Sequence, residues 1–270
     1  PGFYDRTLRG ETAAVQVLLD GADPSTASQT LGQVSARTQA FALGLAGKMA
    51  ATGVAPGRIE ERTLVWYNPG LRMLYSMVPG LLAVVMAMSS LSISLAVARE
   101  KERGTLEALL ATPLRKTELL VGKLVPYLAC GMVSLVLAAL VAIVWFRVPF
   151  RGSFGLLLLL GADFLLGSLA LSLFISNFIG SQGAAMIANF LIFFIPSFFL
   201  TGLFDRLDLQ SAGAVLRSYG LPGTHFVAIS RALFLKGVGL PALAQPALIL
   251  LGMGVVCLTL SVVTFRERLA

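Results

Sequence analysis

Long uncharged stretches are the feature of this sequence that most limits its fold. No Asp, Glu, Lys or Arg occurs in residues 73–98, 124–146 or 237–265, and Asp163 is the only one in residues 152–204. A helix crosses the hydrocarbon core of a bilayer in about 20 apolar residues. Only 13% of the chain is charged, against roughly 25% of a soluble domain. We therefore expect an all-α polytopic membrane protein.

The uncharged stretches predict five spans. The stretch 152–204 is long enough for two crossings, and its Gly-containing segment at residues 176–183 offers the turn between them. The expected spans are residues 75–97, 119–146, 154–175, 184–203 and 242–264.

Residues 1–70 differ from the rest because they are charged and contain no apolar run of spanning length. Residues 13–19 and 62–67 have the composition of strands. Asp23-Pro24 is a helix start, and residues 25–51 have helical spacing. We expect a small α/β domain at 1–70, followed by a transmembrane domain at 71–270.

The Lys and Arg residues between spans indicate orientation. Six of them lie compactly between Arg99 and Lys123, and two more lie in the C-terminal tail. Placing these in the cytoplasm puts residues 1–70 outside it. A further span before Pro1 is then expected, giving six in the full protein. The net charge of +7 belongs to the membrane part and favours an anionic lipid surface as partner over a nucleic acid.

Several residues within or beside the spans are candidates for a path or gate. Asp163 is costly in a membrane, so we expect it to contact a cationic substrate or to bond a neighbouring Ser or Asn, such as Asn189. Pro196 is expected to kink its span. His225, the only histidine, is expected to anchor structure or to sense protons or substrate. A metal site is not expected around a lone His.

A short apolar segment, Phe226–Leu235, is interrupted by Arg231. Ten residues are too few to span a bilayer, so this segment is expected to re-enter the membrane or to lie on its outer surface. An ordinary interfacial loop is the alternative.

The segment between the first two spans has the pattern of a short amphipathic helix. Leu106, Leu109 and Leu110 share one side, Gly104 precedes them, and Pro113 ends the segment. Such a helix either docks into a partner or serves as a solvated connector.

Residues 100–114, EKERGTLEALLATPL, strongly resemble the cytoplasmic loop of ABC-2 type permeases. The similarity continues at Gly122–Tyr127, at residues 148–152, 221–226 and 231–237, and in the tail. The expected extracytoplasmic domain at 1–70 is similar to that of the drug-exporter-like branch of this family. One departure is the turn at 176–183, which has no basic residue where the family usually has one.

The resemblance implies a coupling helix at about residues 100–114 that sits in a groove of a separate ATP-binding subunit. The residues implied in this contact are Glu100, Glu102, Arg103, Gly104, Thr105, Leu106, Glu107, Leu109, Leu110, Thr112 and Pro113. It also implies that the segment with His225, Phe226 and Arg231 is part of a hairpin that forms the outer gate of the path. The expected setting is a bacterial inner membrane, with a second permease copy or a homologue as partner and a periplasmic adaptor as an open possibility.

The chain itself lacks a P-loop, because Gly44–Met49 has the wrong glycine spacing and no Ser or Thr after its Lys. ATP and Mg²⁺ are therefore expected only in the partner, and this chain is expected to be a permease and not an enzyme. A secondary transporter and a non-transporting assembly or signalling subunit are the alternatives. A drug-like or lipid-like substrate is expected, and the sequence does not choose between them.

Overall fold

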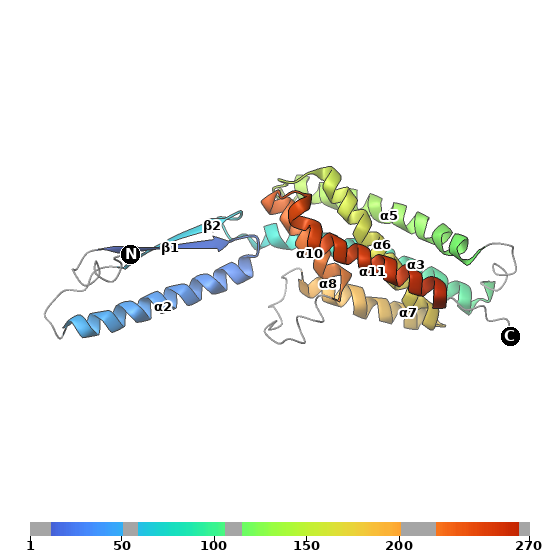
Figure 1. Ribbon diagram of the computed structural model, residues 1–270, viewed down its shortest axis with the longest axis horizontal. Helices are drawn as coiled ribbons and strands as arrows, with labels where there is room; N and C mark the ends of the chain where they lie inside the picture. Colours follow the sequence, from blue (N-terminus) through green and yellow to red (C-terminus); the bar gives the residue numbers. More distant parts are fainter. Residues whose placement is uncertain (1–11, 51–58, 106–114, 201–219, 265–270) are drawn as a thin grey trace. The chain divides into compact units, whose positions relative to one another are not determined.

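The computed structural model describes residues 12–50, 59–105, 115–200 and 220–264 (Figure 1). The chain divides into two compact units, Pro1–Met73 and Leu74–Ala270.

The first unit is built on a β-α-β arrangement. Strand β1 (Ala13–Asp20) pairs in parallel with β2 (Ile59–Trp66), and helix α2 (Pro24–Ala50) connects them. One face of the sheet packs on α2, where Leu19 and Leu45 are buried and the Ser35 hydroxyl bonds the Glu61 carboxylate. The two predicted strands and the helix between them are confirmed within a few residues.

The second unit is a bundle of helices. Among the described residues, four helices are long and apolar enough to cross a membrane: α3 (Met73–Glu102), α5 (Lys116–Val144), α6 (Phe154–Phe178) and α11 (Leu240–Thr264). At 1.5 Å per residue the shortest extends about 37 Å, longer than the roughly 30 Å hydrocarbon core. Four of the five predicted spans are thereby confirmed as helices of spanning length.

The predicted span at 184–203 has a different form in the described residues. It is divided into α7 (Gln182–Asn189), the π-helical segment η1 (Phe190–Phe194) and α8 (Ile195–Leu200). The wide π turns come directly before Pro196, whose ring removes a backbone donor and crowds the carbonyl four residues earlier. The kink predicted at Pro196 stays a prediction, and the described residues show a change of helix type just before it.

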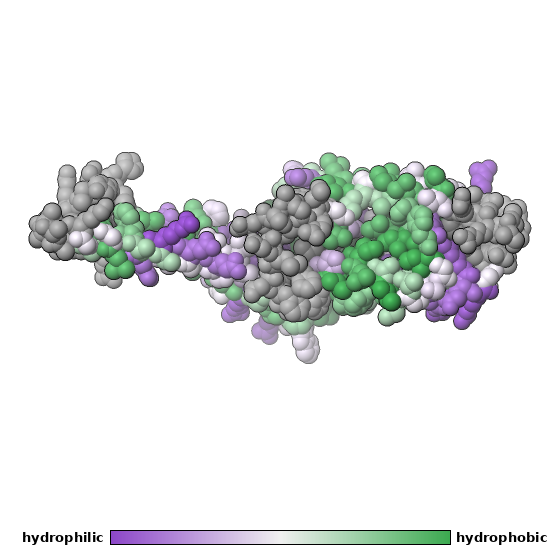
Figure 2. Space-filling view, turned by 90° about the horizontal axis from the view of Figure 1, so that it is seen from below, coloured by the Kyte–Doolittle hydropathy of each residue, from purple (hydrophilic) through white to green (hydrophobic). Residues whose placement is uncertain are grey.

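Two helices carry most of the buried surface of the bundle. Helices α3 and α6 are buried along much of their length. Helix α6 lies beside α5 and α11. Gly167 of α6 faces Gly254 of α11, so the two backbones approach closely. The outer faces of α5 and α11 expose Val and Leu side chains. Figure 2 shows an apolar band across the second unit.

A short helix completes the second unit. Helix α10 (Pro222–Arg231) continues into the π-helical η2 (Ala232–Lys236), and Gly237 ends it with a φ of 64°. Residues 237–239 join it to α11, against which it packs, and we call it the α10–η2 hairpin. Phe226, Leu233 and Phe234 are fully buried. The hairpin thus packs into the bundle and does not lie over its surface as an exposed loop.

Candidate functional site

The charged end of α3 is bonded to three neighbouring helices through the consecutive residues Arg99–Glu102, which we call the α3 hub. Successive residues of an α-helix point about 100° apart, so four in a row can face different neighbours. The Glu100 carboxylate forms an ion pair with Lys123 of α5. Hydrophilic side chains gather at this end of the bundle (Figure 2).

Another hub residue, Lys101, binds the end of α6. Its ammonium donates to the carbonyl oxygens of Ser176 (2.5 Å) and Asn177 (2.9 Å) in the last turn of that helix. The last carbonyls of a helix have no partners within it and carry partial negative charge, so a cation is favourable there. Helix α6 has no basic residue of its own in its last turn.

The start of α7 is held by two other hub residues. One carboxylate oxygen of Glu102 accepts from the backbone N of Gln182 (3.1 Å) and from its side-chain amide (3.0 Å). Arg99 Nε donates to the side-chain oxygen of Gln182 at 3.2 Å. A carboxylate at a helix N-terminus accepts a hydrogen bond from a free backbone N–H and interacts favourably with the positive end of the helix dipole. Helix α7 has no acidic residue in its own first turn.

The chain leaves the hub through a turn at Arg103 and Gly104. Gly104 has a φ of 70°, which is the left-handed conformation that ends helices and favours glycine. The Thr105 hydroxyl bonds back to the Glu100 carbonyl at 3.3 Å, and Arg103 is exposed. Glu100 and Glu102, expected in a separate coupling helix, belong to α3. The remaining expected contact residues lie outside the described residues: Leu106, Glu107, Leu109, Leu110, Thr112 and Pro113.

A buried polar cluster joins α3, α6 and α7 farther along the bundle. The Asn189 amide donates to the Ser94 hydroxyl at 2.7 Å and to the Ala185 carbonyl at 2.9 Å. Its oxygen accepts from the Ser172 hydroxyl at 2.7 Å. Asn189 is only 1% exposed, and both its amide groups have partners. The predicted alternative of an Asn189–Asp163 bond is therefore not what the described residues form.

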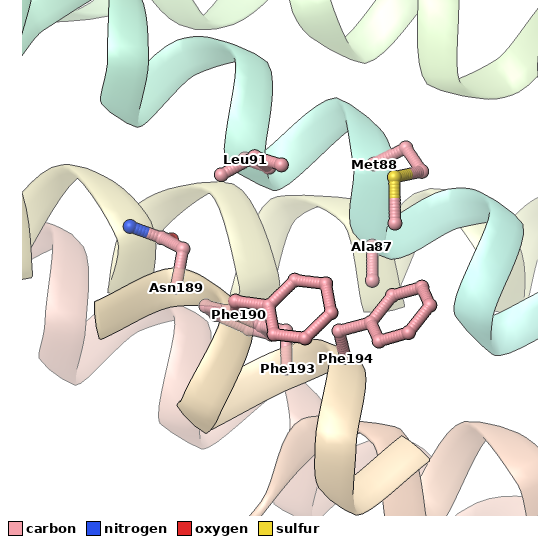
Figure 3. Close-up of a pocket in the computed structure, with 7 residues that line it drawn as sticks. All are labelled: Ala87, Met88, Leu91, Asn189, Phe190, Phe193 and Phe194. Carbon is pink, nitrogen blue, oxygen red and sulfur yellow. The ribbon is translucent and has the colours of Figure 1, made fainter. Parts of the chain in front are cut away.

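A shallow crevice separates α3 from η1 (Figure 3). Its cavity volume is about 10 Å³, so it holds nothing larger than a water molecule in this conformation. The rings of Phe190 and Phe194 stack with centroids 4.4 Å apart and face Ala87, Met88 and Leu91 of α3. Met88 and Phe190 are about two-fifths exposed. The crevice is apolar apart from Asn189 at one end.

The α10–η2 hairpin is bonded to the opposite part of α3. Arg231 Nε donates to the Ser76 carbonyl at 3.1 Å, and the Ser230 hydroxyl donates to the Pro79 carbonyl at 2.9 Å. Phe226 stacks on Phe164 of α6, with centroids 4.6 Å apart. His225 is also buried, at 4% exposure. The residues predicted for a gate at His225, Phe226 and Arg231 all lie on α10, where they are also close in the sequence, and the gate stays a prediction.

Asp163 stands apart from these clusters. It is half-buried on α6, and its Oδ1 is enclosed without a hydrogen-bond partner among the described residues. In those residues, no group of three or more His, Cys, Asp or Glu side chains could hold a metal ion.

Some of the residues that join the helices were not predicted from the sequence as site residues. Lys101, Ser172 and Gln182 were not among the candidates, although each bonds a residue at least 17 positions away. One signal for Lys101 was available: the turn after α6 lacks the basic residue expected there, and α3 supplies it.

Comparison with known proteins provides the context for this arrangement. A family described as ABC-2 family transporter protein matches residues 1–263. The chain is 34% identical to the probable multidrug ABC transporter permease YbhS of Escherichia coli over 96% of its length, and 28% identical to YbhR, of the same description and organism, over 89%. It covers 68% of YbhS and 64% of YbhR. It is also 27% identical, over 78% of its length, to the inner membrane transport permease YhhJ of E. coli, of which it covers 57%.

Proposed function

The chain belongs to the ABC-2 family of transporter proteins, and from this premise we propose that it couples ATP hydrolysis in a separate subunit to export of drug-like molecules. As a family member it is a membrane permease of an ABC exporter and not itself an enzyme. The multidrug description of YbhS and YbhR supports a drug-like substrate. The family match over 263 residues carries the proposal.

The proposed contact with the ATPase is the segment that begins at Thr105. The hub directly precedes it, and only the turn at Arg103–Gly104 intervenes. The apolar side formed by Leu106, Leu109 and Leu110 would be buried in the partner, while the flanking charges would fix orientation. This end of α3 is then cytoplasmic, and residues 1–70 lie outside the cytoplasm.

Helix α3 is the proposed transmission element of the cycle. It contains 30 residues, about 45 Å of helix, and is bonded to the hub contacts at one end and to the α10–η2 hairpin at the other. Movement of the ATPase on binding ATP would displace the coupling segment and, through α3, the hairpin. The hairpin would act as the gate, because Arg231 and Ser230 hold it to α3 in this conformation.

A second permease copy is proposed to complete the transport path. In the described chain one side of α3 remains exposed at Val85, Met88 and Ser92, next to the crevice with Phe190 and Phe194. An apolar surface of this kind suits a drug-like molecule with aromatic groups. ATP and Mg²⁺ would bind in the partner subunit only.

Transport of ethidium into liposomes that contain the purified permease–ATPase complex tests this proposal. Glu107→Lys and Leu110→Asp are expected to abolish ATP-dependent transport while the permease still inserts into membranes. Glu118→Gln is the control, because Glu118 accepts in the described contacts only from the backbone N–H of Arg115, the residue before its own helix, and Gln keeps that acceptor. Normal transport and ATP hydrolysis in both coupling variants, or purification of the wild-type chain without any ATPase, would contradict the proposal.

A further inference from the structure

We propose that Lys101 and Glu102 are positioning residues of the transport cycle, which lock α6 and α7 to α3 so that the three helix ends move together. This inference rests on the proposed function. It differs from the expectation for Glu102, which the family resemblance assigned to contact with the ATPase.

Helix α3 supplies two charges that the last turn of α6 and the first turn of α7 lack. Helix α6 ends without a basic residue in its last turn, and α7 begins without an acidic one. The adjacent residues Lys101 and Glu102 bring a cation to the first of these ends and a carboxylate to the second. Each charge has the sign that the helix end requires, so the turn between α6 and α7 is held from both sides.

The side chains of Lys101 and Glu102 already form hydrogen bonds to other residues of this chain. Lys101 is half-buried and donates to two carbonyl groups, and one Glu102 oxygen accepts two hydrogen bonds. An ATPase that recruited either side chain would have to break these bonds. The neighbouring Arg103, exposed like Glu102, is not held by these bonds and is therefore more available for that contact.

A second set of hydrogen bonds, farther along the bundle, also joins α3, α6 and α7. The Ser176 hydroxyl donates to the Ser94 carbonyl at 3.3 Å, and Asn189 joins Ser94 to Ser172. These ends of α3, α6 and α7 are therefore connected at two levels. Beyond Asn189 the chain enters the π-helical segment η1, where the crevice separates it from α3. A displacement of the hub would then move α6 and α7 together and bend the chain near η1.

Distance measurement by electron paramagnetic resonance tests the lock. Spin labels are placed on cysteines at two exposed positions, Ser92 of α3 and Met186 of α7, with Cys130 and Cys257 replaced by alanine. The full-length permease in complex with its ATPase is measured without nucleotide and after trapping with ATP and vanadate. The labelled permease is diluted with unlabelled copies so that each complex carries one labelled pair, and in the wild type we expect one narrow distance that nucleotide does not change.

Lys101→Met should broaden this distance distribution and make it respond to nucleotide, while the ATPase remains bound. Export of ethidium per ATP hydrolysed should fall roughly tenfold, within the range of coupling between sites, with hydrolysis itself within about twofold of wild type. Lys101→Arg, which keeps the donor, should restore the ratio. If Lys101→Met is not recovered from membranes, Glu102→Ala provides the same test for α7, with Glu118→Gln as its control.

The outcomes separate this inference from the proposed function. A distance in the variants as narrow as in the wild type would overturn the lock, as would a wild-type distance that changes with nucleotide. Loss of ATPase binding in Lys101→Met would show that the hub is a partner contact instead. A wild type that binds no ATPase would refute the proposed function, while the nucleotide-free distances would still test the lock.

Discussion

Replacement of Asn189 by Leu removes the polar junction of α3, α6 and α7 while roughly keeping side-chain volume. The substitution deletes two interhelical bonds, to the hydroxyls of Ser94 and Ser172, each 2.7 Å long. A hydrogen bond between helices in a membrane contributes about 0.6 kcal/mol on average and about 1.7 kcal/mol at most, so two of them amount to between about 1 and about 3 kcal/mol. We expect a loss of free energy of unfolding in this range.

Unfolding in mixed micelles with increasing SDS, followed by circular dichroism, measures this loss. Ser134→Ala is the matched control, because its hydroxyl bonds only the Cys130 carbonyl of the same helix. The control should stay within about 0.5 kcal/mol of wild type, as substitutions away from packing and networks usually do. A similarly small effect of Asn189→Leu would refute the view that this cluster holds the three helices together.

Two further substitutions test the hairpin. Gly237→Ala places a Cβ 2.8 Å from the Arg151 carbonyl at a φ of 64°, and should destabilise the bundle by at least about 1 kcal/mol in the same unfolding assay. Gly252→Ala, which meets no atom within 4 Å, should be neutral or stabilising, and equal effects of the two would contradict the explanation. Arg231→Met removes the bond to the Ser76 carbonyl and should accelerate amide exchange in residues 222–236 roughly tenfold, as loss of a charged hydrogen bond predicts. Unchanged exchange would mean that Arg231 does not hold the hairpin.

The elements that the sequence predicts well are those set by local composition. Four spans follow from uncharged stretches, because a nonaqueous solvent selects long apolar helices whatever their neighbours are. The strands at Ala13 and Ile59 follow from β-rich composition, and α2 from its Pro24 start. The fifth span shows the limit of this reasoning, since hydropathy does not reveal the π-helical turns before Pro196.

The contacts between helices are much harder to predict from the sequence. Lys101 and Ser176 lie 75 positions apart, and Ser94 and Asn189 lie 95 apart. Only packing brings these partners together, so composition near Lys101 predicts a cytoplasmic cation and no more. Burial of the α10–η2 hairpin has the same origin, because Phe226 stacks on Phe164 of α6 and Phe234 packs on Phe150 in the connection between α5 and α6.

A photo-reactive amino acid at Thr105 tests the central claim, that the segment after the α3 hub binds a separate ATPase, most directly. Thr105 is exposed, and Val144, 71% exposed at the far end of α5, provides a control position. Irradiation of intact membranes should join Thr105, but not Val144, to a nucleotide-hydrolysing protein. Absence of that adduct at Thr105, or equal capture at Val144, would contradict the account.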